Sequence, residues 1–342
     1  MSRKNLNVSK KIHRFLLKKL EDKRTFQIYK KFESYLNINE NFVVAVSGGP
    51  DSLALSFLAK IYSIKKSLNI KYFIVDHKLR KNSSSEAKFV QKQLKKFSIN
   101  LEILNWNGEK PTNNIQSIAR KKRYNLIINK TKKLKIKNIL IGHHLDDLFE
   151  NFFIRILRGS GLNGLISLDQ ETQIDKLNVI RPLLNFQKKD LIYISEHVFG
   201  SYIEDPSNKE EKFKRVRIRN FLKDLQLEGL DKNKFILTIN NLKHANDTIK
   251  FYTKKNLNEN TYLSNNKKLF ILKENFFYQS HEVIFRSITE IIKFIGQKYY
   301  PVRGKKIDKI IQKIKSSNSL KTTLGGCLIK KVNQTVILSK ER

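Results

Sequence analysis

The stretch FVVAVSGGPDSLALSFLAKI, residues 42–61, contains the unit from which the rest of the fold follows. Residues 42–46 form an apolar run typical of a buried strand, and residues 53–61 have the composition of a helix. Between them, two adjacent glycines allow a tight turn that brings backbone N–H groups against an anion, and the positive end of the following helix faces the same anion. The order strand, glycine turn and helix therefore predicts a phosphate-binding loop at residues 47–52.

The loop SGGPDS contains one acidic residue, Asp51, which would repel a phosphate group unless a divalent cation lay between them. Mg²⁺ normally binds through one or two carboxylates and phosphate oxygens, so Asp51 is a candidate magnesium ligand. Ser47 and Ser52 can add hydroxyl donors. The loop does not end in Gly-Lys-Ser/Thr, which excludes a Walker A loop. The alternative interpretation is a surface turn with a Ser or Asp helix cap.

Apolar runs and amphipathic stretches alternate along residues 42–199. This alternation predicts an α/β fold with a doubly wound parallel five-stranded sheet, covered by helices on both faces. Ligands of such sheets bind beyond the carboxyl ends of the strands, where the strand order reverses. The motifs SGGPDS, VDHKLR and GHHLDD follow the first, second and fourth expected strands, so we expect them to line one site. The expected strands are 42–46, 71–75, 101–106, 138–142 and 178–183, and the expected helices are 53–64, 84–97, 114–134, 146–157 and 187–198.

The length of 342 residues suggests about two domains. A turn-rich stretch at 204–208 and the basic run KFKRVRIRNFLKDL separate the alternating region from the rest of the chain. Helices at 283–298 and 305–315, and a hairpin over 321–339 that turns at Gly325-Gly326, are expected near the C-terminus. The expected divisions are a basic N-terminal extension over 1–36, a catalytic domain over 37–212, a basic linker helix over 213–240 and a smaller, mostly helical domain over 241–342.

The chain has a large excess of basic over acidic residues. Lys and Arg number 68 against 31 Asp and Glu, which gives a formal net charge of +37. A field of this size attracts phosphate backbones, so a nucleic acid is the expected partner. No membrane partner is expected, because no segment has the uninterrupted apolar length of a spanning helix.

Cys327 is the only cysteine, which excludes an internal disulfide framework and a Cys-only metal site. We therefore expect a reducing, cytoplasmic location. The N-terminal sequence is basic and lacks the apolar core and cleavage site of a secretory signal. An organelle presequence is the alternative to the preferred interpretation, a basic amphipathic helix that contacts RNA or packs on the body of the protein.

The segment GHHLDDLFEN, residues 142–151, places carboxylates in the first turns of a helix. Asp147 and Glu150 are three residues apart and share a face, while Asp146 and Glu150 are four apart. Carboxylates gathered at a ligand-facing rim suit a cationic substrate or a metal. Two alternatives stay open at this point: the acids are caps that favour the helix dipole, or the cluster holds a catalytic metal by itself together with His143 and the next histidine.

Further candidates lie at the same rim. Arg120, in IARKKRY, offers a planar charged fork that binds phosphate and can stabilise charge on a leaving group, with a solvated basic face as the alternative. Asp76 ends the second expected strand and could bind a ribose hydroxyl or only start a turn, and His77 follows it. The glycine loop RGSGLNGL, residues 158–165, could be only a helix cap and connector.

Taken in order, these blocks resemble the tRNA(Ile)-lysidine synthetases, which are members of the PP-loop ATP-pyrophosphatase superfamily. The chain departs from the family pattern at Lys78, where glycine is usual, and at Asn151, where threonine is usual. The matching blocks cover roughly residues 42–222 and are SGGPDS, VDHKLR with SSSEAKFV, IARKKRY, GHHLDDLFEN, RGSGLNGL, RPLL, EDPSN and RVRIRNFL, with the weaker TTLGGC near the end.

The resemblance implies a ligase that forms lysidine on the wobble cytidine of tRNA(Ile) with a CAU anticodon, using ATP and free lysine. The cytidine carbonyl oxygen would attack the α-phosphorus, diphosphate would leave, and AMP would then leave as the lysine amine attacks. The C-terminal domain would bind the tRNA. A homodimer is a further expected assembly.

The resemblance also implies roles for the candidate residues. Asp51 would hold Mg²⁺, Arg120 would contact the adenylate, and Asp147 and Glu150 would bind the positive charge of lysine. Arg217, or Arg219 in the same RVRIRNFL block, would complete the lysine pocket or meet the RNA backbone. The residues implied for ATP binding are Ser47, Gly48, Gly49, Pro50, Asp51 and Ser52, and the additional rim residues are Asp76, His77 and His143.

Three other classes of function compete with this interpretation. A thiolase of the same superfamily would deliver sulfur and would generally need paired cysteines or an iron–sulfur cluster, and this chain has one cysteine. An amidotransferase-type relative would need a glutaminase partner. A non-catalytic basic RNA-binding module would bind RNA with steep salt dependence and would form no diphosphate.

Overall fold

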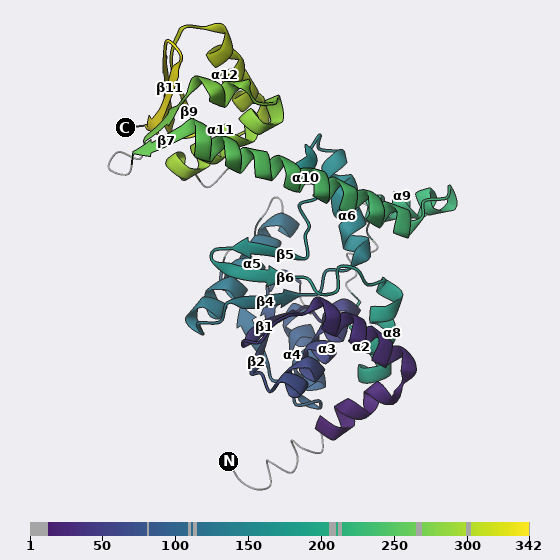
Figure 1. Cartoon of the computed structure of the whole chain (residues 1–342). Helices are drawn as coiled ribbons and strands as arrows, with labels where there is room; N and C mark the ends of the chain where they lie inside the picture. The colour runs from purple at the N-terminus through teal and green to yellow at the C-terminus, as the bar shows by residue number, and fades with distance from the viewer. Residues whose placement is uncertain are drawn as a thin grey trace. The chain divides into compact units, whose positions relative to one another are not determined.

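The computed structural model of the chain describes residues 13–80, 82–108, 111, 115–204, 210, 214–264, 269–298 and 302–341. Two compact units make up the chain, Met1–Leu230 and Asp231–Arg342. Figure 1 shows the helices and strands of each. Among the described helices, none combines the length and the apolar composition needed to cross a membrane.

A six-stranded sheet forms the centre of the first unit, with the order β3-β2-β1-β4-β6-β5. Five strands are parallel, as predicted, and the sixth, β5, pairs antiparallel with β6 at the edge. The strand order reverses between β1 and β4, which is the switch point where ligands of such sheets bind. The strands are β1 (Phe42–Val46), β2 (Ile70–Asp76), β3 (Leu101–Asn105), β4 (Asn138–Ile141), β5 (Glu171–Ile174) and β6 (Leu177–Ile180).

Helices cover both faces of this sheet, which confirms the doubly wound prediction. The helical elements of the unit are η1 (Lys19–Glu21), α2 (Lys23–Tyr35), α3 (Pro50–Lys66), α4 (Ser83–Lys95), α5 (Ile115–Lys133), α6 (Leu145–Ile156), α7 (Leu162–Leu165), α8 (Lys188–Phe199) and α9 (Lys214–Leu227). Adjacent residues of β1 point to opposite faces. Val44 packs in one buried cluster with Phe57 of α3 and Ile194 of α8, whereas Val43 packs in another with Ile127 of α5.

The boundaries of the first unit differ from the expected ones. The expected N-terminal extension, of which residues 1–12 lie outside the described residues, contributes α2, and its Tyr29 and Phe32 are fully buried in the main core. The expected linker over 213–240 is divided, because α9 contacts α6 and belongs to the first unit while the next helix opens the second. Apolar faces on α2 and α9 that pack on the unit explain the difference.

The carboxyl edge of the parallel strands carries the polar motifs, as the sequence predicts. SGGPDS follows β1, VDHKLR spans the end of β2, and GHHLDD follows β4. Trp106, the only tryptophan of the chain, follows β3 at the same edge. It is 8% exposed, and its backbone N–H donates to the Asp76 carbonyl oxygen at 2.9 Å. The edge is therefore closely packed as well as polar.

The second unit combines helices with a five-stranded antiparallel sheet of order β7-β8-β11-β10-β9. Both predicted C-terminal helices are present, and β9 and β10 form the predicted hairpin around Gly325-Gly326, where φ is +63° and +82°. The helices agree with the expected mostly helical domain, but β7 and β8 were not foreseen, and residues 321–339, expected as one hairpin, span parts of three strands, β9, β10 and β11. The elements are α10 (Lys232–Asn260), β7 (Thr261–Ser264), β8 (Leu269–Leu272), η3 (Glu274–Tyr278), α11 (His281–Gly296), α12 (Gly304–Ser316), β9 (Ser319–Leu324), β10 (Cys327–Val332) and β11 (Thr335–Lys340).

Candidate functional site

The glycine turn has the geometry that the sequence predicts. Gly48 has a φ of +88°, and a Cβ there would lie 2.9 Å from Val90 Cγ2, so no larger residue fits without a shift. Gly49 caps the N-terminus of α3, and Pro50 occupies its first turn. The first N–H groups of a helix have no partner within the helix, so the start of α3 faces the end of β1 with donors for an anion.

The Ser52 hydroxyl stabilises this turn from within. It accepts hydrogen bonds from the N–H groups of Ser47 and Gly48, both at 3.1 Å, and donates to the carbonyl oxygen of Gly49 at 3.0 Å. The side chain is buried. Ser52 therefore holds the shape of the loop, whereas the sequence suggested a hydroxyl that faces the phosphate.

Neighbouring elements fix the loop from outside. The Ser195 hydroxyl of α8 donates to the Pro50 carbonyl oxygen at 2.6 Å, and the Ile203 N–H donates to the Gly48 carbonyl oxygen at 3.0 Å. Gly142, after β4, lies so close that a Cβ on it would be 3.2 Å from the Asp51 carbonyl oxygen. The motif GHHLDD is thereby brought against the loop. Of the block EDPSN that follows Ile203, only its first residue is among the described residues.

Asp51 and Asp147 face each other across His144. The Nε2 atom of His144 lies 3.6 Å from the Oδ2 atom of each carboxylate. Burial raises the pKa of Asp51, and the neighbouring His144 imidazole opposes this shift. Burial also favours the neutral form of Asp147, but His144, His143 and the His144 N–H together lower its pKa. Asp147 therefore stays ionised to a lower pH than Asp51 does.

The capping alternative for the acidic segment is also realised. The Asp147 carboxylate accepts from the His144 N–H at 3.1 Å, and His144 Nδ1 accepts from the Asp146 N–H at 3.2 Å. These contacts cap α6 and at the same time aim Asp147 at the loop. Capping and ligand binding are therefore compatible roles for this segment.

The residues around Asp51 fit Mg²⁺ only if phosphate oxygens supply the other ligands. No group of three or more His, Cys, Asp or Glu side chains in the described part of the chain could hold a metal ion, which disfavours a metal site built from the acidic cluster alone. Asp51 Oδ1 is buried and has no hydrogen-bond partner in the described structure. One such carboxylate oxygen together with phosphate oxygens is a normal magnesium environment.

Glu150 lies further along α6 and is 2% exposed. Arg219 of α9 donates to both of its carboxylate oxygens, through Nε to Oε1 and through Nη2 to Oε2 at 3.5 Å. Burial raises the pKa of Glu150, while the Arg219 hydrogen bond and charge oppose the shift. Arg217, the residue named first from the sequence, is exposed on α9. The structure thus brings Arg219, and not Arg217, to the acidic cluster.

His143 is partly buried and lies between two guanidinium groups. Arg181, the first residue of the block RPLL after β6, donates through Nε to His143 Nδ1 at 3.2 Å, and Arg120 Nη2 lies 3.2 Å from His143 Nε2. Burial lowers the pKa of His143 to about 3, with Arg120 and Arg181 adding to the shift and Asp147 opposing it. The imidazole is therefore neutral near pH 7.

A cavity of about 200 Å³ lies between these groups. Isoleucines and valines of β1, β4, β6 and α5 form an apolar part, and the glycine loop at residues 47–52, the arginines and Asp147 form a polar part. Arg215 of α9 was not foreseen, although its spacing of four from Arg219 places both on one helix face. The lining residues are Ala45, Val46, Ser47, Asp51, Ser52, Arg120, Arg123, Tyr124, Ile127, Ile128, Ile139, Ile141, Gly142, His143, Asp147, Val179 and Arg215.

Asp76 and His77 lie at the same edge but shape a turn. Asp76 accepts from the Ser83 hydroxyl at 2.7 Å, from the Ser84 hydroxyl and from the Lys78 N–H at 3.0 Å. Burial favours its neutral form, but the two hydroxyls and the N–H lower its pKa. His77 Nδ1 accepts from the Leu79 N–H at 3.2 Å. Neither Asp76 nor His77 lines the cavity.

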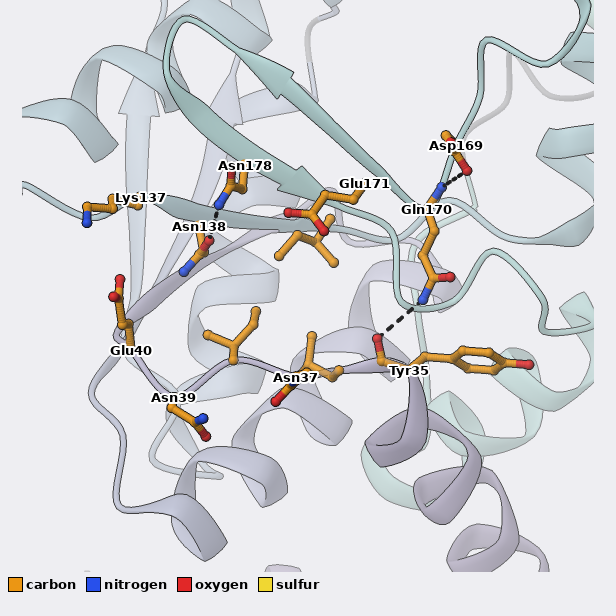
Figure 2. A pocket seen from close by; sticks show the side chains of 13 residues that line it. Tyr35, Asn37, Asn39, Glu40, Lys137, Asn138, Asp169, Gln170, Glu171 and Asn178 are labelled. Atoms are coloured by element: carbon orange, nitrogen blue, oxygen red, sulfur yellow. Dashed lines mark hydrogen bonds between the residues drawn. The ribbon is translucent and has the colours of Figure 1, made fainter. Parts of the chain in front are cut away.

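A second hollow, of about 810 Å³, lies between the segment that precedes β1 and the strands β4 and β6. Figure 2 shows Asn178 bonded to Asn138 and Gln170 bonded to the backbone of Tyr35, at 3.0 and 3.2 Å. Its labelled polar side chains come mainly from Asn37 to Glu40 and from the residues around Gln170. None of the candidate site residues lines it.

The fold and the first cavity define the class of the protein. A parallel sheet whose first strand leads through a glycine turn into a helix, with a cavity at the switch point, is the arrangement of a nucleotide-binding α/β domain. Residues 19–225 match the family model described as a PP-loop domain. The solved structure of the U34-tRNA thiolase NcsA from Methanococcus maripaludis shares this fold, with a TM-score of 0.56 and 17% sequence identity over 65% of this chain and 79% of that one.

Sequence relatives define the family more narrowly. A tRNA(Ile)-lysidine synthase of Wolbachia sp. subsp. Brugia malayi (strain TRS) is 31% identical over 89% of this chain and 71% of its own length. A tRNA(Ile)-lysidine synthase of Orientia tsutsugamushi (strain Boryong) is 33% identical over 89% of this chain and 70% of its own. The chain belongs to the tRNA(Ile)-lysidine synthase family of PP-loop proteins.

Proposed function

We propose that this protein joins lysine to C2 of the wobble cytidine of the CAU-anticodon tRNA(Ile), while ATP is converted to AMP and diphosphate. The observation that carries the proposal is that Asp51, Arg120 and Asp147, from three separate motifs, line one cavity beside the PP-loop. Membership of the lysidine synthase family supports the same reaction. The cytoplasm, where tRNA, ATP and free lysine are available, is the location that this activity needs.

The cavity suits an adenine nucleotide as the first substrate. Partly exposed side chains such as Tyr124 and Ile141 can pack against a base, and the N–H groups at the start of α3 can bind phosphate. We assign to the Arg120 guanidinium the neutralisation of charge on the α-phosphate. Asp51 would hold Mg²⁺, which when bound supplies charge neutralisation for the leaving diphosphate.

Two displacements complete the reaction. The O2 atom of the cytidine attacks the α-phosphorus, and the bond to the β-phosphate oxygen breaks with release of diphosphate. The lysine ε-ammonium then loses a proton to solvent water, and the free amine attacks C2, so that the bond from C2 to O2 breaks and AMP leaves with the former O2 atom. The protein positions these groups and balances their charges.

The acidic residues of α6 suit lysine as the second substrate. Asp147 keeps its charge because its pKa is lowered, so it can pair with an ammonium group. Glu150 is buried beside it and is aligned by Arg219. Of the two arginines that the sequence suggested for the lysine pocket, Arg217 and Arg219, we therefore assign the role to Arg219.

The second unit suits RNA binding, which the sequence predicts from charge alone. Phe251 and Tyr252 are exposed on α10, with Lys250 before them and Lys254 and Lys255 after them. Aromatic rings beside lysines can stack on bases and neutralise phosphates. We assign contact with the body of the tRNA to this surface. A homodimer stays a prediction that sedimentation of the full chain can test.

A thiolase activity is not favoured. The similarity to a thiolase is one of fold at 17% identity. The single cysteine, Cys327, is buried in the second unit, and burial raises its pKa to about 11, so it is a poor sulfur carrier.

The proposal is tested by incubating the protein with labelled lysine, ATP, Mg²⁺ and the CAU-anticodon tRNA(Ile), followed by nucleoside analysis. We expect lysidine, AMP and diphosphate in equal amounts, and no lysidine when any component is omitted. Asp51→Ala serves as the control and should stop AMP release while the circular dichroism spectrum stays unchanged. Incorporation of sulfur, or RNA binding without AMP release, would replace the proposal with one of its rivals.

A further inference from the structure

The surroundings of His143 contain a mismatch of hydrogen-bonding groups. A neutral imidazole has one N–H donor and one acceptor nitrogen, whereas a guanidinium has donors only and is permanently charged. Both ring nitrogens of His143 lie 3.2 Å from an arginine nitrogen. Only one of the two contacts can therefore be a hydrogen bond, and the other brings two donors together.

Of the two contacts of His143, the one with Arg181 is held in place by further hydrogen bonds of the Arg181 guanidinium. Arg181 is 6% exposed, and its Nη1 atom donates to the Asp169 carbonyl oxygen at 2.8 Å and to the Thr172 hydroxyl at 3.0 Å. Thr172 belongs to β5, the antiparallel strand at the sheet edge. With its guanidinium held on this side, Arg181 directs Nε–H at His143 Nδ1.

In the other contact of His143, with Arg120, the guanidinium is held less firmly and can move. Arg120 is partly exposed on α5, and its guanidinium also lies 3.4 Å from the Tyr124 hydroxyl on the same helix. Arg120 also lies over the Tyr124 ring, 5.4 Å from its centroid. These weaker contacts allow the guanidinium to move within the cavity that both Arg120 and His143 line.

We propose that Arg181 is a positioning residue that keeps the proton of His143 on Nε2, so that His143 and Arg120 donate together to one phosphate oxygen of the bound nucleotide. The identity of the acceptor rests on the proposed function, but the tautomer does not. Two N–H donors cannot satisfy each other, and an oxygen that accepts from both resolves the mismatch. A neutral N–H of this kind stabilises negative charge without acting as a base.

The tautomer is tested by nuclear magnetic resonance of the full chain with ¹⁵N-labelled histidine. The His143 signals are assigned by their loss in His143→Gln. We expect Nδ1 to be unprotonated and Nε2 protonated in the native protein, and this preference to be lost in Arg181→Met. Arg24→Met, at an exposed arginine that pairs with Asp190 outside the cavity, is the matched control and should leave the signals unchanged. Protonation of Nδ1 in the native protein would overturn the proposal.

Kinetics test the consequence for catalysis. We expect Arg181→Met to lower kcat for AMP release by about tenfold to a hundredfold, with little change in KM for lysine. His143→Gln keeps an N–H near the position of Nε2, so it should retain more activity than His143→Asn. In the His143→Gln background, Arg181→Met should have little further effect, because the two residues act as one unit.

Arg181 is buried, so Arg181→Met can fail to fold. Thr172→Val then provides the test, since it removes one anchor of Arg181 and leaves the arginine in place. A native-like tautomer and full activity in Thr172→Val and in Arg181→Lys would overturn the positioning role. If the tautomer depends on Arg181 but the native protein forms no AMP, the proposed function fails while the positioning role stands.

Discussion

Lys78 adopts a φ of +50°, in the left-handed region that glycine enters at little cost. Its N–H donates to Asp76 Oδ1, which fixes this backbone geometry. We expect Lys78→Gly to raise the free energy of unfolding by about 0.5–1 kcal/mol, because relief of the Cβ clash exceeds the entropy that glycine loses on folding. Chemical denaturation measures the change. Lys78→Ala keeps the Cβ and should give no such gain; an equal gain would contradict the explanation.

Arg219 and Arg217 are two residues apart on α9 and have different surroundings. Arg219→Gln leaves the buried Glu150 carboxylate without its charged partner, so we expect a loss of about 2 kcal/mol in stability. The lysine pocket should be damaged too, with KM for lysine raised by about tenfold while KM for ATP changes little. Arg217→Gln, at an exposed position, should stay within about 0.5 kcal/mol and keep normal kinetics. Similar effects of both substitutions would remove Arg219 from the pocket.

His143 makes stability depend on pH in a defined direction. Its pKa is lowered from 6.5 to about 3 by burial, so below pH 6.5 the unfolded chain takes up a proton that the folded protein does not. Stability is therefore lost as the pH falls from 6.5 toward 3, by about 2 kcal/mol between about pH 7 and about pH 5. Urea unfolding at both pH values should show that His143→Gln removes this part of the loss. His244→Gln, at an exposed histidine of α10, should leave the loss unchanged.

At the scale of elements, the turn between β1 and α3 separates the roles of its two glycines. Gly48 has a positive φ and a neighbour, Val90, that a Cβ would contact at 2.9 Å, whereas Gly49 has a φ of −75° and its nearest neighbour, the Ile203 carbonyl oxygen, would be 3.9 Å away. We expect Gly48→Ala to destabilise the first unit by about 1–3 kcal/mol. Gly49→Ala should change thermal stability little, although it can weaken ATP binding. Equal losses of stability would show that the turn tolerates neither change.

The parallel strands and their helices could be predicted because buried strands and amphipathic helices leave a clear period in the sequence. The edge strand β5 could not. Its hairpin with β6 turns at Asp175 and Lys176, both with positive φ, where the usual signal is Asn-Gly or Asp-Gly. A four-residue strand without that signal looks like a loop, and this strand carries the Thr172 anchor of Arg181.

Site residues that directly follow a strand could be predicted from the sequence. Where several similar residues lie close together on one helix, only the packing of that helix decides which of them faces the site. Asp51 and Asp147 follow strands at the switch point, so topology alone brings them together. Arginines alternate along the block RVRIRNFL, and the pattern does not say which one turns inward. Burial of Val216 and Ile218 sets the rotation of α9 and directs Arg219 at Glu150.

At the scale of the whole molecule, each unit has its own core. Isoleucines of α11 and α12 pack with residues of β8, β10 and β11 in the second unit, and α10 begins with the Asp231 side chain accepting from Asn233 and Lys234 N–H groups. We expect residues 231–342, produced alone, to give a cooperative thermal transition by circular dichroism. They should also bind tRNA, with an affinity that falls steeply with salt. A fragment that melts without a transition would show that the second unit needs the first to fold.

Trp106 has a practical consequence for such measurements. The chain has a single indole, and it lies at the carboxyl edge of the sheet in the first unit. Indole emission, excited at a wavelength where tyrosine does not absorb, therefore follows one unit, whereas far-ultraviolet ellipticity follows both. In the intact chain, different unfolding midpoints for the two signals would show that the two units unfold separately, and equal midpoints would show that they unfold together. The comparison needs no added dye or label.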